Sequence, residues 1–149
     1  MINRKLFSSQ SIIDKLAFAK VRGRMTTRMS RVNREGSEYY TWIPGTVAAG
    51  AYEYIELHTQ FPRLRKYLPA NFVEVSNNDV VNLTIFLNGN VESLPCPAGT
   101  IRVIRKSVPC IWQLAIRNDD AVSAITANAV IVTVRREPKT ADDLAREEY

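Results

Sequence analysis

Residues 72–136 consist of short apolar runs separated by turn-forming residues, and this alternation constrains the fold more than any other feature. The runs are rich in β-branched and aromatic side chains, which suit a pleated, half-buried surface. The residues between them are mostly Asn, Asp, Pro and Gly, which are typical of turns. No helical pattern of about 10–15 residues separates the runs, which argues against a parallel sheet. The five runs are 72–75, 80–87, 100–104, 111–116 and 129–134.

Additional strands extend this pattern into a β domain over residues 38–137. Residues 38–43 and 47–57 indicate two earlier strands, and Asn88-Gly89 predicts a tight hairpin that adds a strand after it. About seven or eight short strands, with turn signals about every 8–12 residues, predict a mainly β fold. We expect an antiparallel β-sandwich, jelly-roll-like in its topology.

Residues 1–37 form a basic N-terminal arm. They carry nine Lys and Arg against two acidic residues, a net charge of +7, whereas residues 38–137 carry nine of each sign. Apolar residues at helical spacing predict a short helix over residues 10–22. The segment 24–37 is cationic and has no consistent period, so we expect it to be extended or disordered when alone in water.

The C-terminal tail, residues 138–149, has a net charge of −2. Thr140 followed by Asp143 is a capping pattern, which predicts a short exposed helix in this tail. The chain shows no signal peptide and no apolar run of about 20 residues that could span a bilayer. We therefore expect synthesis in the cytoplasm and a soluble or peripheral protein.

The basic arm is the strongest functional signal in the sequence. Arginine dominates its second half, and the guanidinium group binds phosphate and carboxylate through paired hydrogen bonds. The arm could contact nucleic acid, an anionic membrane surface or acidic patches on neighbouring subunits. The alternative is a solvated extension that only aids solubility. The predicted contact residues are Arg22, Arg24, Arg28, Arg31 and Arg34.

Cys96 and Cys110 are the only cysteines in the sequence. A disulfide between them would close a loop of about 15 residues and contribute roughly 3 kcal/mol to stability. Two reduced, buried thiols are the alternative, because free cysteine is among the most buried residue types. A zinc site is not expected, because such sites need four ligands.

Catalytic and cofactor motifs are absent from the sequence. His58 is the only histidine, and neither Gly-x-Ser-x-Gly nor a glycine-rich phosphate loop accompanies it. Glu53 and Glu56 stand three residues apart on a predicted strand and so face opposite sides, which does not suit shared acid–base chemistry. We expect a protein that is not an enzyme and has no cofactor or metal, with His58 in a surface or packing role.

Three segments of the β domain follow one another in a pattern of turns and strands. They read VEVSNNDVVNLTIFLNGNVESLPCPAGTIRVIRKS, CIWQLAIRN and NAVIVTVRRE. This pattern resembles the small β-sandwich structural proteins of phage and virus particles. The resemblance implies a capsid, cement or minor structural component of the virion without catalysis. Its partners would be further copies of the chain, as a homo-oligomer, or other virion subunits.

An alternative function is binding of single-stranded nucleic acid by the β domain itself, built as a β-barrel. Aromatic residues are dense between positions 39 and 61 and could stack on bases, although core and subunit-interface packing is their more common use. The predicted second basic surface comprises Arg63, Arg65, Lys66, Arg102, Arg105 and Lys106.

Overall fold

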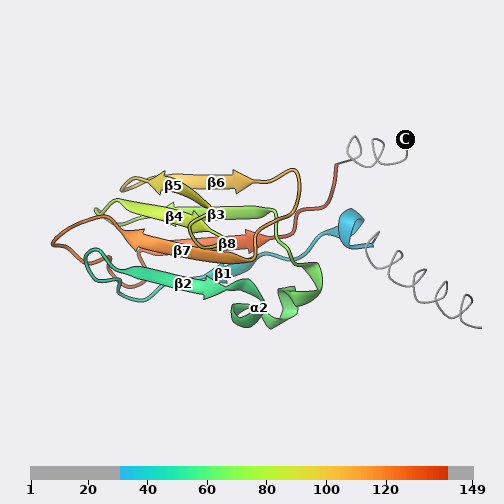
Figure 1. Ribbon diagram of the computed structural model, residues 1–149, viewed down its shortest axis with the longest axis horizontal. Helices are drawn as coiled ribbons and strands as arrows, with labels where there is room; N and C mark the ends of the chain where they lie inside the picture. The colour runs from blue at the N-terminus through green and yellow to red at the C-terminus, as the bar shows by residue number, and fades with distance from the viewer. Residues whose placement is uncertain (1–30, 141–149) are drawn as a thin grey trace, which may run out of the picture.

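The computed structural model describes residues 31–140, which form two four-stranded antiparallel sheets (Figure 1). One sheet has the strand order β1-β8-β3-β6 and the other has β2-β7-β4-β5. Two short helices, α2 (Leu57–Gln60) and η1 (Pro62–Tyr67), follow β2. The strands are β1 (Tyr40–Trp42), β2 (Tyr52–Glu56), β3 (Phe72–Asn77), β4 (Leu83–Leu87), β5 (Glu92–Cys96), β6 (Ile101–Arg105), β7 (Gln113–Asn118) and β8 (Val130–Arg135).

The two sheets share one hydrophobic core. In β8, Val130, Val132 and Val134 are buried while Ile131 and Thr133 remain partly exposed, as a strand period of two predicts. The mainly β prediction is therefore confirmed. Among residues 31–140, no helix has the length and apolar character needed to cross a membrane.

The connections between strands gather at two opposite ends of the molecule. Figure 1 shows both ends of the described chain at the same end, on the right, which we call the proximal end. An isolated β-bridge connects two loops at each end. Val47 pairs with Ile125 at the opposite, distal end, and Ala70 pairs with Ile111 at the proximal end. The proximal loops are 57–71, 88–91 and 106–112, and the distal loops are 43–51, 78–82, 97–100 and 119–129.

Several predicted element boundaries differ from the structure. The run 80–87 becomes a strand only at Leu83, because the Asp79 side chain accepts the Val80 N–H and holds the preceding residues in a turn. Asn88-Gly89 does reverse the chain, with positive φ at both residues, but the register joins Leu87 to Glu92 through a four-residue loop. Pro95 belongs to β5, which as an edge strand tolerates the missing N–H.

The last residues of the predicted arm, 31–37, belong to the folded body, which corrects the expectation that this part of segment 24–37 is extended or disordered. Residues 31–35 are helical, and Val32 is buried. The Ser37 N–H donates to the Arg136 carbonyl oxygen at 2.8 Å, and the Arg136 N–H donates to the Ser37 hydroxyl at 2.9 Å. The predicted helices at 10–22 and beyond Thr140 lie outside the described residues.

Arg136 holds three proximal segments together. Its guanidinium is buried and donates to the Pro69 carbonyl at 2.9 Å and to the Asn33 side-chain oxygen at 3.0 Å. Burial lowers the pKa of Arg136 from its ordinary value, since the charged form loses hydration. The arginine thus joins the base of the arm to the segment that follows η1.

Two fully buried asparagines organise the distal loops in the same way. Asn77 ends β3, and its side-chain oxygen accepts the Asp79 N–H at 3.1 Å. Asn118 ends β7 and accepts the Asp120 N–H at 2.9 Å. Each asparagine also donates its amide to backbone carbonyls of neighbouring loops, including Val81 for Asn77. The two Asn-x-Asp sequences predicted as turns therefore close the distal end.

Asp79 makes stability depend on pH. Its carboxylate accepts the N–H of Thr126 at 2.7 Å and that of Val80 at 2.7 Å. These bonds lower the pKa of Asp79, and the bond from Thr126 is the largest cause. A lowered folded-state pKa gives stability that is present above about pH 4 and lost as pH falls through the folded value. We expect Asp79→Asn to cost about 1.5–3 kcal/mol at neutral pH.

Urea unfolding at a series of pH values, followed by tryptophan fluorescence, to which buried Trp42 contributes, measures this effect. The difference between wild type and Asp79→Asn should shrink below about pH 4. Glu53→Gln removes an exposed carboxylate and is the control. An Asp79→Asn penalty that stays constant down to acid pH would show that the charge is not responsible.

Candidate functional site

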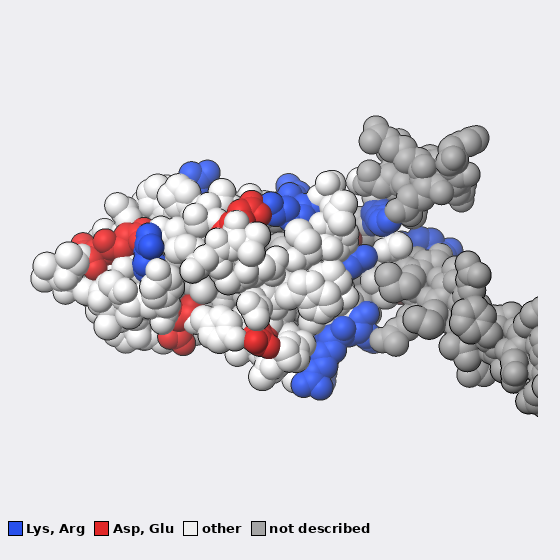
Figure 2. Space-filling model, in the orientation of Figure 1, with Lys and Arg blue, Asp and Glu red and all other residues white. Residues whose placement is uncertain are grey.

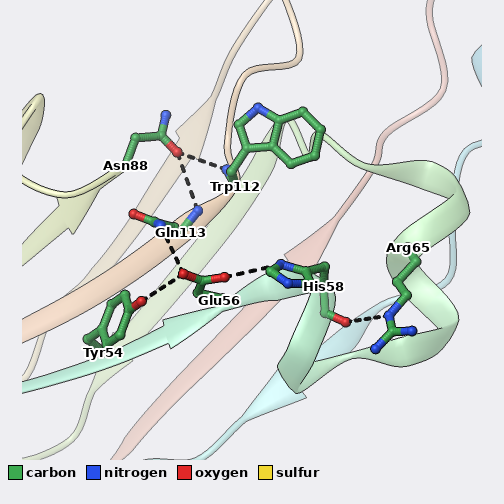
Figure 3. Close-up of polar contacts among 7 residues, drawn as sticks. All are labelled: Tyr54, Glu56, His58, Arg65, Asn88, Trp112 and Gln113. Atoms are coloured by element: carbon green, nitrogen blue, oxygen red, sulfur yellow. Dashed lines mark hydrogen bonds and ion pairs between the residues drawn. The ribbon is translucent and has the colours of Figure 1, made fainter.

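A polar cluster around Glu56 and His58 lies where β2 meets α2 (Figure 3). The Glu56 Oε1 atom accepts the Tyr54 hydroxyl at 2.8 Å and the Gln113 amide at 3.2 Å. Its Oε2 atom lies 3.3 Å from His58 Nδ1. Donation to Glu56 raises the pKa of Tyr54. The cluster joins the outer face of β2 to β7.

Asn88 and Arg65 extend this cluster across the proximal loops, as Figure 3 shows. The Asn88 side-chain oxygen accepts the N–H groups of Trp112 and Gln113, at 2.8 and 3.3 Å. Arg65 Nε donates to the His58 carbonyl oxygen at 2.7 Å, which holds η1 against α2. The contacts of Asn88 and Arg65 are thus with backbone atoms, which is the pattern of a structural network.

The Glu56–His58 pair resembles the acid and base of a hydrolytic triad but lacks the third member. A triad needs a nucleophile within hydrogen-bond reach of the imidazole. Within residues 31–140, no hydroxyl or thiol is hydrogen-bonded to His58, and no cluster of His, Cys, Asp and Glu could hold a metal ion. The His58 side chain is 52% exposed and so lies at the surface.

Charge is distributed unevenly between the two ends of the body. The proximal loops contain Arg63, Arg65, Lys66 and Lys106 and no acidic residue. The distal loops contain three aspartates and no Lys or Arg. On the face in Figure 2, most Lys and Arg lie toward the proximal end, while acidic side chains occupy the middle and the distal half. The body therefore has one basic end, and the arm begins there.

The strongest concentration of cations at this end surrounds a surface depression of about 520 Å³. We call it the proximal basic depression. Arg63, Arg65 and Lys66 all project from the single short helix η1, and all three are exposed. Tyr40 and Tyr67 supply partly exposed aromatic rings. The lining includes Glu38, Tyr40, Arg63, Arg65, Lys66 and Tyr67.

The predicted second basic surface is divided by the fold. Arg105 lies 3.4 Å from Glu137, and Lys106 lies 2.6 Å from Glu92. Arg102 is on the edge strand β6 and donates to the Pro95 carbonyl. Only Arg63, Arg65 and Lys66 line one depression. Sequence could not reveal this, because each carboxylate is far along the chain from its cation. Glu92 is 14 residues from Lys106, and Glu137 is 32 residues from Arg105.

The five predicted arm contacts are only partly described. Arg31 pairs with Glu35 at 3.1 Å on the same helical turn, and Arg34 is exposed. Arg22, Arg24 and Arg28 lie outside the described residues. Arg31 also lines a second depression of about 230 Å³, which shares Lys66 and Tyr67 with the proximal basic depression.

Cys96 and Cys110 do not form the candidate disulfide. Cys96 is buried at the end of β5, and burial raises the pKa of its thiol. Cys110 is exposed in a proximal loop, which differs from the expectation that both reduced thiols would be buried. The two residues lie at opposite ends of the molecule, because Cys96 leads into the distal loop 97–100.

No protein-family model matches this chain, and no curated protein sequence matches it significantly.

Proposed function

We propose that this protein is a non-enzymatic structural subunit of a virus particle, built on a jelly-roll β-sandwich. The strand order is the observation that carries the proposal. Six of the seven connections cross between the sheets, and only the β4–β5 hairpin stays within one. From this order, β1-β8-β3-β6 and β2-β7-β4-β5, we infer the eight-stranded double Greek key of a jelly roll.

The charge distribution supports a shell protein in particular. Jelly rolls also occur in lectins and cupins, so topology alone does not select a function. Here the basic arm enters the body at the end that carries the basic loops, while the distal loops have no cation. A subunit of this kind would turn its basic end toward an acidic polymer and its distal end toward solvent.

Exposed apolar side chains on the outer sheet faces supply candidate contacts between copies. Tyr52 and Tyr54 are 55% and 56% exposed on β2. Ile101 and Val103 are 62% and 47% exposed on β6. Aromatic side chains are enriched at protein interfaces, and the fully buried centre of an interface is more apolar than its rim. We propose the virion as the location of the protein, with homo-oligomers or other virion subunits as its partners.

Mass measurement of the full chain in solution, combined with electron microscopy, tests this function. We expect closed assemblies of many copies, promoted by nucleic acid and weakened by about 1 M salt, which screens the arm. Particles of uniform diameter would support the proposal. A monomer at high protein concentration, both with and without nucleic acid, would overturn it.

A further inference from the structure

We propose that the proximal basic depression binds the sugar–phosphate backbone of single-stranded nucleic acid. This inference goes beyond the proposed function, because a monomer could bind nucleic acid in the same way. It places a contact on the folded body, where Arg63, Arg65 and Lys66 line one side of the depression.

The three cations of η1 form no ion pair within the described part of the chain, although Glu38 also lines the depression. No carboxylate of residues 31–140 lies within 4.0 Å of any of them, although Arg31, Arg105, Lys106 and Arg117 all have such partners. Three unpaired cations within one short helix repel one another. An anion in the depression would relieve this repulsion.

The surroundings of Arg65 prepare it for a phosphate. Its Nε atom donates to the His58 carbonyl oxygen at 2.7 Å, which fixes the plane of the guanidinium. The two terminal nitrogens have no hydrogen-bond partner among the described residues and can form the paired bonds that arginine makes to phosphate oxygens. Arg63 has no hydrogen bond in the same part of the chain and remains available as well.

A second depression adjoins the first and shares Lys66 with it, although its own cation Arg31 is paired with Glu35, so the two hollows together suit an extended ligand. The second depression is lined by Arg31, Glu35, Lys66 and Tyr67, so Lys66 and Tyr67 stand between the two hollows. A nucleic acid strand presents phosphates at regular intervals and can occupy both hollows at once. A single free anion would occupy only one.

The aromatic lining favours nucleic acid over an anionic membrane or an acidic protein. Tyr40 is held by a ring contact with Phe61 at 5.5 Å, and Lys66 lies 5.1 Å from the centre of the Tyr67 ring. Tyrosine rings beside cations are the usual combination for stacking unpaired bases along a charged groove. No large exposed aliphatic residue lines the depression, as insertion into a lipid layer would require.

The test compares two variants of the full chain that lose the same charge in different places. The first carries Arg63→Gln, Arg65→Gln and Lys66→Gln. The matched control carries Arg102→Gln, Arg105→Gln and Lys106→Gln. Fluorescence anisotropy with an oligothymidylate of about 20 nucleotides gives the dissociation constant at several salt concentrations, because site sizes are about 4–16 nucleotides.

Loss of three phosphate contacts should reduce the magnitude of the logarithmic salt slope by about 2, at about 0.7 per single-strand phosphate. If the η1 variant and the wild type bind equally at about 1 M salt, this difference in slope makes the η1 variant bind roughly 100-fold more weakly at about 0.1 M salt. The control should change by less than about threefold. The single variant Arg63→Gln should reduce the magnitude of the salt slope by about 0.7. Because Arg63 is exposed, this variant provides a test if the triple variant does not fold.

Equal losses in the two triple variants, or no loss in either, would overturn the proposal. So would stronger binding of the wild type to phosphatidylserine vesicles or to polyglutamate than to the oligonucleotide. Tyr67→Leu should weaken binding by about 5- to 150-fold with an unchanged salt slope, as the loss of one stacked base predicts. Retained binding without particle formation would count against the proposed function and leave this inference standing.

Discussion

Gly36→Ala is expected to lower the free energy of unfolding by about 2–5 kcal/mol. Gly36 has φ of +66°, in the left-handed region that disfavours any residue with a Cβ atom. A methyl group built there would lie 2.5 Å from the Arg136 carbonyl oxygen and 2.8 Å from the Pro138 ring. Both neighbours are rigid backbone or ring atoms, so the close packing adds to the conformational cost.

Two other glycines provide matched controls for this variant. Gly50 also has a positive φ, +70°, but an added Cβ there would meet no atom within 4 Å. Gly50→Ala therefore reports the conformational cost alone, about 1–2 kcal/mol. Gly45 has neither a positive φ nor a close neighbour, and Gly45→Ala should change stability by less than about 1 kcal/mol. Urea unfolding followed by tryptophan fluorescence compares the three variants.

If Gly36→Ala destabilises the protein most, Gly50→Ala less and Gly45→Ala least, the base of the arm is packed against the body in solution. Gly36→Ala with no larger effect than Gly50→Ala would mean that residues 31–37 are detached. The result matters for function because this junction sets the end of the molecule from which the arm departs. A detached junction would remove the link between the arm and the basic end.

Local sequence was sufficient to predict the strands, the turns and a mainly β, antiparallel fold, but not the contacts that pack short segments against the body. Alternating valines in β8 and the Asn-x-Asp turns depend on neighbours in the chain, and both were predicted. The helical turn at 31–35 was missed, since Val32 is buried by contacts with the body rather than by any local period. Tertiary packing commonly overrides propensity in such short segments.

The candidate site shows the same limit more sharply. Lys66 and Lys106 look equivalent in the sequence, since each directly follows an arginine. Only the fold places Glu92 2.6 Å from Lys106 and leaves Lys66 over a tyrosine ring. A charge count therefore located the basic arm but could not separate neutralised cations from available ones on the body.

Asn118→Ala is expected to destabilise the protein by about 3–5 kcal/mol. The Asn118 side chain is fully buried and donates to the carbonyl oxygens of Val47 at 3.1 Å and Ser123 at 2.8 Å. Its own oxygen accepts the Asp120 N–H at 2.9 Å. Alanine would leave these groups without partners in a closed loop junction, and each unsatisfied buried group costs about 1–3 kcal/mol.

Asn90→Ala, at an exposed loop position, should stay within about 0.5 kcal/mol of wild type in the same urea titration. Equal stability of the two variants would show that water reaches the distal junction and replaces the lost bonds, so that Asn118 does not hold the distal loops together.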